Sequence, residues 1–359
     1  MLKECSFFPI RRVSSDMRCY FFCTIFETLT LSSVIDIIRK GNLFSFYQYF
    51  IEGDGVANII AIIWDFDKTL INGYMEDPLL EDNGINPKDF WQETNSLPQK
   101  YANEQNVKVN PDTIYLNQLI NYAKSGRLKG LNNQKLREYG KKMKFYPGVP
   151  DIFEKTRDLI ENNEIYQEYD IKVEHYIISS GLSEIIRGSE VAKYVSNIWG
   201  CEFIEIESDD GKPIIGEIGY TIDNATKTRA LFEINKGVGK VSGVQVNTTL
   251  PKEHRRVHFI NMVYVADGPS DIPAFSVVNK NGGATFAVYP AGDMRAMKQV
   301  EIMRQDNRIN MFAEADYSEG KTACMWLCGK IEEFAEKIRE EEKRKLSQFI
   351  NKKPPQHLI

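Results

Sequence analysis

Two aspartates, Asp65 and Asp67, stand one residue apart at the end of the apolar run in residues 59–64. Such a run, rich in β-branched side chains, is typical of a strand that is buried on both faces of a parallel sheet. The aspartates would then lie at the carboxyl end of that strand, where open α/β sheets bind their ligands. Because neighbouring carboxylates repel each other, the pair indicates either a bound cation or one protonated member. The simpler alternative is that the aspartates cap the next helix.

A second pair of acids follows another apolar run, which predicts a buried strand over residues 262–266. Asp267 and Asp271 lie four residues apart around a turn that contains Gly268 and Pro269. One acidic cluster after a strand is easily structural. Two clusters at the carboxyl ends of strands in one sheet are difficult to explain without a hard cation between them, because such cations prefer carboxylate oxygens.

A third strand, predicted over residues 173–178, leads into a segment that could bind a phosphate group. Three small residues follow it, before a helix predicted over residues 182–188: Ser179, Ser180 and Gly181. A serine hydroxyl can donate a hydrogen bond, glycine lets the backbone approach closely, and a helix N-terminus offers free amides. An ordinary strand-to-helix turn with a serine cap is the alternative.

Lys227 is the candidate for a positive group at the same site. It follows Thr226 at the start of a predicted helix, where a positive charge is unfavourable with the helix dipole. A surface lysine is the ordinary explanation. The functional alternative is that its ammonium group points into an anionic site.

The segments between these residues indicate how the chain is organised. Residues 73–143 show helical periodicity and no convincing strand, which predicts a helical insertion directly after the first strand. It could be a lid over the strand ends or a second packed layer. Asn110-Pro111-Asp112 is a reasonable helix start, and residues 331–350 predict a charged amphipathic helix. The predicted divisions are a sheet domain in residues 58–72 and 144–330, the insertion, and a helix and tail in residues 331–359.

Residues 1–57 differ from the rest of the chain, and three interpretations stay open. They could be a peripheral helical extension, an interfacial membrane segment, or the product of a start codon assigned too early, with translation beginning near Ala57. No apolar run among them reaches the roughly 18 residues that a membrane helix requires. We favour an extension that the chemistry does not need, and we expect no stable membrane insertion.

The composition excludes several classes of function. The chain has 359 residues, of which 42% are hydrophobic and 26% are charged, as in an ordinary soluble protein. The net charge of −5 argues against a non-specific nucleic-acid binder, which would need a basic face. Six cysteines are too few for a disulfide scaffold and lack zinc-site spacing, so a reducing cytoplasm is the default location. The four histidines do not cluster, which argues against a His-based metal site or a Ser-His-Asp triad.

These segments, in this order, resemble the four motifs of the haloacid dehalogenase superfamily of phosphohydrolases, over about residues 58–320. The first motif is similar to Asp65-Phe66-Asp67-Lys68-Thr69, and the second to Ser179. The third is similar to Lys227, and the fourth to Asp267-Gly268-Pro269-Ser270-Asp271. Lys227 is preferred because it stands at a helix start, at the usual interval before the fourth motif; the lysines it displaces are Lys212, Lys236 and Lys240.

The resemblance implies an α/β fold with a Rossmann-like, three-layer parallel sheet and a helical cap inserted after the first strand, as in the first cap class of the superfamily. The chain most resembles the phosphoserine-phosphatase-like branch. That branch selects the amino group of serine with a glutamate shortly after the first motif. Here Tyr74 stands at about that position and Glu76 two residues further on, which argues against serine phosphate as the substrate.

The resemblance also implies a two-step phosphoryl transfer from a small phosphorylated metabolite. Asp65 would attack phosphorus and form an aspartyl-phosphate, while Asp67 would protonate the leaving oxygen and later activate water. The implied cofactor is Mg2+, held by the Asp65 carboxylate, the Asp67 backbone carbonyl and Asp267. The implied phosphate-binding residues are Ser179, Ser180, Gly181 and Lys227, and the supporting residues are Thr69, Gly268 and Asp271.

Other functions share some of these features. A phosphotransferase would use the same motifs and pass the phosphoryl group to an alcohol instead of water. A non-catalytic phospho-ligand-binding protein is disfavoured by the intact acids in both clusters. A P-type ion pump, which also has an Asp-Lys-Thr sequence, is excluded by the lack of apolar spans. Carbon–halogen cleavage is rejected because the dehalogenases of the superfamily lack the acid found here at Asp67. The oligomeric state is left open.

Overall fold

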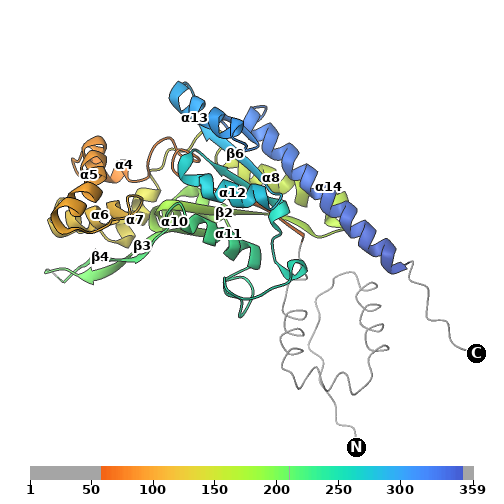
Figure 1. The fold of residues 1–359 in the computed structure, drawn as a ribbon, viewed down its shortest axis with the longest axis horizontal. Coiled ribbons are helices and arrows are strands. Elements are labelled where there is room, and N and C mark those ends of the chain that lie inside the picture. Colours follow the sequence, from red (N-terminus) through yellow and green to blue (C-terminus); the bar gives the residue numbers. More distant parts are fainter. Residues whose placement is uncertain (1–57, 210, 351–359) are drawn as a thin grey trace, which may run out of the picture. The chain divides into compact units, whose positions relative to one another are not determined.

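The computed structural model describes residues 58–209 and 211–350 (Figure 1). The predictions for residues 1–57 and for the tail after residue 350 lie outside these residues. Every helix in the described part of the chain is too short or too polar to cross a membrane.

A seven-stranded sheet forms the centre of the fold, in the order β4-β3-β2-β1-β5-β6-β7. Its strands are β1 (Asn58–Trp64), β2 (Ile171–Leu182), β3 (Asn197–Glu207), β4 (Pro213–Tyr220), β5 (Met262–Ala266), β6 (Ala284–Tyr289) and β7 (Met311–Glu314). All neighbouring strands are parallel except β3 and β4, which form an antiparallel hairpin. If the edge strand β4 is left out, the order is β3-β2-β1-β5-β6-β7. Renumbered along the chain, these six strands have the order 3-2-1-4-5-6 of a doubly wound Rossmann fold. The expected α/β class with a Rossmann-like parallel sheet is therefore confirmed.

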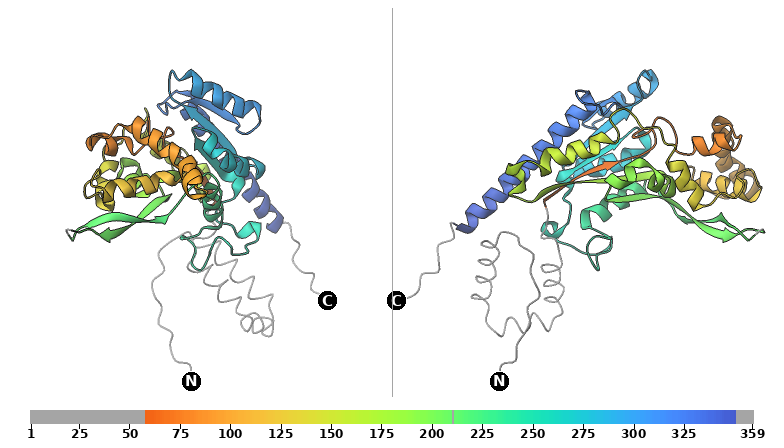
Figure 2. Two further views of the ribbon diagram at one scale, coloured as in Figure 1. Left: turned by 60° about the vertical axis from the view of Figure 1, so that its left-hand side comes forward. Right: turned by 180° about the vertical axis from the view of Figure 1, so that it is seen from behind.

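Helices cover both faces of this sheet, which gives the expected three layers (Figure 2). Trp64, the last residue of β1, packs against Phe153 of α8 (Asp151–Glu161), with ring centroids 5.3 Å apart. Ile63 pairs with Tyr264 of β5, so alternation directs Tyr264 to the opposite face, where its ring contacts Phe275 of α12 (Ile272–Lys280). Helix α14 (Thr322–Ile350) packs beside α8, and α11 (Thr226–Lys236) packs beside α12.

Four helices lie between β1 and α8 in the chain and gather at one end of the sheet (Figure 1). They are α4 (Asp77–Asp82), α5 (Pro87–Gln105), α6 (Ile114–Lys124) and α7 (Asn133–Gly140). The chain returns to the sheet domain beside the point where it left, because the Tyr146 amide donates to the Leu70 carbonyl at 2.9 Å. The region has the helical character expected for residues 73–143, while the proposed domain boundaries stay a prediction.

The β3–β4 hairpin contacts these helices, which the sequence did not indicate. The Ile215 amide of β4 donates to the carbonyl of Leu131, just before α7, at 2.8 Å. The Asn133 amide at the start of α7 donates to a carboxylate oxygen of Glu205 in β3 at 2.7 Å. The inserted helices are therefore fastened to an extension of the sheet.

The remaining helices are short or lie at the edges. They are α9 (Glu164–Gln167), α10 (Ser183–Gly188) and α13 (Met294–Gln305), with 3-10 turns at Glu190–Tyr194, Lys252–His254, Phe259–Asn261 and Pro269–Asp271.

Several predicted boundaries differ from the structure. Helix α6 begins at Ile114 because the Asn110 side chain accepts the Asp112 amide, at 3.0 Å, and holds the preceding residues in a turn. Strand β2 continues beyond residue 178 to Leu182 and includes an irregularity in register. Helix α14 begins at Thr322, before the predicted residue 331, since its first turns are apolar rather than charged.

Candidate active site

The acids of the first and fourth motifs meet at one edge of the sheet. Asp65 directly follows β1 and Asp267 directly follows β5, and these strands are parallel neighbours. The Asp65 amide donates to the Val265 carbonyl at 2.8 Å, which extends the pairing to the aspartate. One carboxylate oxygen from each of Asp65, Asp267 and Asp271 lies within 4.8 Å of the others. Asp65 and the second acidic pair therefore form one group, at the switch point where doubly wound sheets bind ligands.

Lys227 is buried in this group and is not a surface lysine. Its ammonium group lies 2.9 Å from Asp65 Oδ1 and 2.7 Å from Asp271 Oδ1, and its side chain is 1% exposed. Burial alone would lower the pKa of Lys227, but the carboxylates of Asp271 and Asp65 outweigh it and raise that pKa above its ordinary value. The neighbouring carboxylates therefore favour the charged form of the lysine.

Asp271 holds the lysine in place. Besides Lys227, its Oδ1 accepts a hydrogen bond from the Tyr264 hydroxyl at 2.6 Å, and its Oδ2 accepts one from the Ser270 hydroxyl at 2.9 Å. Both oxygens thus accept hydrogen bonds from protein donors. Tyr264 was missed by the sequence analysis, because a tyrosine in an apolar strand is ordinarily a core residue.

The loop after β1 orders Asp65. The Thr69 hydroxyl lies 3.3 Å from Asp65 Oδ2, and the Thr69 carbonyl accepts a hydrogen bond from the Tyr317 hydroxyl at 2.7 Å. Lys68 has a positive φ of 55°, and its amide donates to the Gly73 carbonyl at 3.1 Å, which closes the loop. The supporting role of Thr69 stays a prediction.

Asp67 has different surroundings from Asp65. Its Oδ1 accepts a hydrogen bond from the Met75 amide at 2.9 Å, and its carboxylate does not belong to the three-acid group. Burial, followed by the charges of Glu76 and Asp65, raises the pKa of Asp67 well above its ordinary value. Burial also raises the pKa of Asp65, but the attraction of Lys227 limits that pKa to about 6. One carboxylate thus faces a cation, while the other favours the protonated form.

The segment Ser179–Gly181 lies in β2 and not in the predicted turn before a helix. The Ser179 hydroxyl oxygen accepts the Gly181 amide at 3.0 Å, and the Ser180 carbonyl accepts the Tyr115 hydroxyl at 2.7 Å. A Cβ atom at Gly181 would lie 3.3 Å from Asp67 Oδ2 and 2.3 Å from the Met75 side chain. The strand end therefore reaches the active-site acids through a glycine that keeps the space open. Helix α10, with six residues and no side-chain cap, is too short to be the main anion-binding element.

Glu76 is a second residue that the sequence analysis did not place in the site. It is 1% exposed, and among the described residues no donor contacts its Oε1. Burial raises the pKa of Glu76 to about 8. Tyr74, which stands at the position noted in the sequence, is 38% exposed and accepts a hydrogen bond from the Lys68 ammonium at 2.6 Å. Its place two residues beyond the position noted in the sequence did not predict its burial, which depends on how α4 packs.

The donor set suits a hard divalent cation. Asp65, Asp267 and Asp271 supply three carboxylates against the single ammonium of Lys227, so the group carries excess negative charge in a buried place. In the described part of the chain, no donor occupies the Asp267 carboxylate. Two oxygens bound to one Mg2+ ion lie at most about 4.2 Å apart, close to the span observed here. The contribution of the Asp67 backbone carbonyl stays a prediction.

The comparisons with known proteins give one family relationship. No protein-family model matches the chain. An uncharacterized protein of Borreliella burgdorferi is 36% identical over 287 residues, which cover 76% of this chain and 97% of that protein. The chain belongs to the same family as this protein. That family membership assigns no activity.

Several solved structures are similar in outline. They include a HAD family hydrolase from Salmonella enterica serovar Typhi, with 16% identity, 72% of this chain and 67% of that chain covered, and a TM-score of 0.44. A phospho-aspartyl intermediate analogue of phosphoserine phosphatase has 18% identity, 71% and 93% coverage, and a TM-score of 0.41. A probable phosphoserine phosphatase from Vibrio cholerae has 11% identity, 79% and 68% coverage, and a TM-score of 0.44. Identities and TM-scores this low do not support any conclusion about function. The proposal below therefore depends on the residues of the site.

Proposed function

We propose that the protein is a Mg2+-dependent phosphatase of the haloacid dehalogenase type, which hydrolyses a small-molecule phosphomonoester through an aspartyl-phosphate on Asp65. The observation that supports this most is the buried ammonium of Lys227 between Asp65 and Asp271, with the Asp267 carboxylate beside them. An ammonium group fixed at one carboxylate can stabilise the charge of a phosphoryl group that approaches the same carboxylate. A cytoplasmic location and a phosphorylated metabolite as partner belong to the same proposal.

In the first step, a carboxylate oxygen of Asp65 attacks phosphorus, and the bond between phosphorus and the alcohol oxygen breaks. Asp67 gives its proton to that oxygen, so the product leaves as a neutral alcohol. The raised pKa of Asp67 supports this role, because the group must hold a proton until the bond breaks. Lys227 and the Ser179 hydroxyl would donate to the non-bridging oxygens.

In the second step, Asp67 takes a proton from water, and the water oxygen attacks the phosphorus of the aspartyl-phosphate. The bond between phosphorus and Asp65 breaks, which releases inorganic phosphate and restores both carboxyl groups. The Met75 amide holds Asp67 Oδ1 throughout, so the same carboxyl group can serve both steps without moving far.

Asp65, Asp267 and the Asp67 backbone carbonyl would hold Mg2+, which supplies positive charge that reduces the repulsion between a carboxylate and a phosphate dianion. Asp271 would not need to bind the ion, because its oxygens already accept hydrogen bonds from Lys227, Tyr264 and Ser270. Its role would be to hold the lysine.

The test is the hydrolysis of para-nitrophenyl phosphate by the full-length protein and by Asp65→Asn. The variant should lose at least about 1,000-fold in turnover while unfolding at a similar urea concentration, because an amide is a poor nucleophile. Asp158→Asn, an exposed aspartate of α8, is the matched control and should keep full activity. Full activity in Asp65→Asn would refute the nucleophile assignment. Adding glycerol as an acceptor and measuring glycerol phosphate would separate hydrolysis from phosphotransfer.

A further inference from the structure

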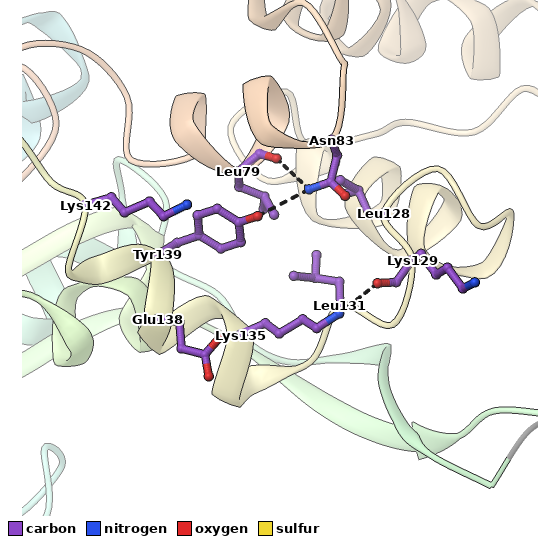
Figure 3. Close-up of a pocket in the computed structure, with 9 residues that line it drawn as sticks. All are labelled: Leu79, Asn83, Leu128, Lys129, Leu131, Lys135, Glu138, Tyr139 and Lys142. Atoms are coloured by element: carbon purple, nitrogen blue, oxygen red, sulfur yellow. Dashed lines mark hydrogen bonds between the residues drawn. The ribbon is translucent and has the colours of Figure 1, made fainter.

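A small cavity lies among the inserted helices (Figure 3), and its lining includes none of the active-site acids. Its volume is about 200 Å³. It lies between α4 and α7 and is lined by Leu79, Asn83, Leu128, Lys129, Leu131, Lys135, Glu138, Tyr139 and Lys142. The proposed function uses none of these residues.

The lining is divided by chemistry into an apolar floor and a cationic rim. Leu79, Leu128 and Leu131 are each at most 2% exposed and form the floor. The rim contains three lysines and one acid of the lining set: Lys129, Lys135, Lys142 and Glu138. A ligand that matches this lining has a compact apolar body and one negative group.

Two of the rim lysines have no carboxylate of their own. In residues 58–209 and 211–350, no acidic side chain pairs with Lys129 or Lys135, whereas Lys142 pairs with Asp82. The Lys135 ammonium donates to the Lys129 carbonyl at 2.9 Å, which fixes the amine at the rim (Figure 3). It keeps two further N–H donors. Lys135 is therefore the residue best placed to bind an anion.

The volume limits the size of the ligand. A water molecule occupies about 30 Å³ in the liquid, so a cavity of this size accommodates a body of roughly seven to ten non-hydrogen atoms. Drug-sized ligands occupy pockets of about 300–1,000 Å³, which is more than this cavity offers. We propose that the cavity binds a small aryl or branched-chain carboxylate, with the carboxylate on Lys135 and the apolar body on the three leucines.

The two walls of the cavity both lead to the contact between Met75 and Gly181, beside Asp67. Helix α4 directly follows Glu76, whose preceding residue Met75 donates its amide to Asp67. Helix α7 is packed tightly on α10, which follows Gly181. A Cβ atom at Gly140 in α7 would lie 2.1 Å from the Ile185 carbonyl oxygen of α10, so this contact leaves no free space.

A ligand between α4 and α7 would therefore couple to catalysis. Within the cavity, the Asn83 amide and the Tyr139 hydroxyl make a long hydrogen bond of 3.4 Å between the two walls (Figure 3). Filling the apolar floor adds contacts between the walls and stabilises the arrangement in which Met75 is held on Asp67. Binding should lower the KM for a phosphomonoester, and this kinetic effect rests on the proposed function, whereas binding itself does not.

The test uses sodium benzoate as the probe, titrated into the full-length protein by isothermal titration calorimetry. We expect saturable binding with one site per chain, at least tenfold weaker for Lys135→Ala and at least tenfold weaker for benzamide, the neutral analogue. Lys141→Ala removes an exposed lysine outside the cavity lining and should bind benzoate as the wild type does. Leu131→Phe places an aromatic ring in the cavity and should abolish binding.

Three results would overturn the proposal: no binding at millimolar benzoate, equal affinity for benzamide, or equal affinity in Lys135→Ala. The coupling is tested by measuring the KM for para-nitrophenyl phosphate with and without saturating benzoate. We expect benzoate to lower this KM at least twofold in the wild type and to leave it unchanged in Lys135→Ala. An unchanged KM with saturable binding would refute the coupling. A protein that binds benzoate but hydrolyses no phosphomonoester would refute the proposed function and leave the cavity assignment in place.

Discussion

Replacing Lys227 with methionine tests the centre of the proposed site. Methionine keeps much of the length of the side chain but removes the ammonium group that lies 2.9 Å from Asp65 and 2.7 Å from Asp271. Two buried carboxylates would then face each other without a cation. Removing one partner of a buried ion pair costs about 3–5 kcal/mol of folding free energy. This loss is large compared with the roughly 5–15 kcal/mol that stabilises an ordinary domain.

The double variant Lys227→Met/Asp271→Asn separates folding from catalysis. It removes one charge of each sign, so its loss of unfolding free energy should be smaller than the sum of the losses in Lys227→Met and Asp271→Asn by about 0.5–3 kcal/mol, the range of coupling between contacting residues. Its activity should not recover. Losing a fixed donor at the reacting oxygens costs about 100- to 1,000-fold in kcat, and the second substitution does not replace that donor.

Urea denaturation in EDTA measures the stabilities, so that added divalent ions do not compensate for the missing charge. Turnover of para-nitrophenyl phosphate in Mg2+ measures activity. Lys236→Met is the matched control on the same helix, because the Lys236 ammonium donates to the Val246 and Thr248 carbonyls instead of to carboxylates. Activity of Lys227→Met within tenfold of the wild type would refute its role at the phosphoryl group. Stability losses that simply add in the double variant would refute the coupling to Asp271.

Three further predictions concern the metal, Glu76 and the core. EDTA should lower turnover at least about 100-fold and Mg2+ should restore it, because the carboxylates would repel the phosphate without a cation; turnover that EDTA leaves unchanged would remove the metal from the mechanism. Glu76→Gln should raise the unfolding free energy at pH 7 by about 1–2 kcal/mol, because burial raises the pKa of Glu76 to about 8 and folding therefore requires the carboxyl group to take up a proton, which glutamine does not need; a loss in urea denaturation would show that the carboxylate has a stabilising partner. Burial lowers the pKa of His175 to about 3, so below the ordinary value of 6.5 the unfolded chain binds a proton that the folded chain does not. The stability of the wild type relative to His175→Gln should therefore fall by about 2 kcal/mol between pH 6.5 and pH 5, because the buried carboxyl groups contribute equally to the pH dependence of both proteins; equal pH dependence in both would contradict the assignment.

The buried strands were the most predictable part of the fold. The predicted strand in residues 262–266 corresponds to β5, because strands covered on both faces are apolar at every position. Strand β7 (Met311–Glu314) and helix α13 were not predicted, since a four-residue edge strand and a mostly polar helix lack a clear periodicity. The serine and glycine residues of 179–181 are equally common within a strand and in the turn after it. The end of β2 was therefore predicted too early.

Residues of the site were predictable where their chemistry is unusual for their position. Charged side chains directly after apolar strands identified Asp65 and Asp267, and a lysine at a helix start identified Lys227. Glu76 and Tyr264 could not be identified in this way. A glutamate before a helix and a tyrosine in a strand are ordinary in sequence, and only the packing of α4 and the face of β5 bring them to the site.

The two faces of the sheet explain why the lysine meets the first aspartate. Trp64 packs on Phe153 of α8, so the next residue, Asp65, points to the opposite face, which α11 covers. Tyr264 lies on that same face because it pairs with Ile63, and its hydroxyl reaches Asp271. Helix α11 supplies Lys227 to this face. The apolar residue before the aspartate therefore selects the side on which the charged group assembles, and the alternation of a single strand links the packing of the core to the chemistry at its edge.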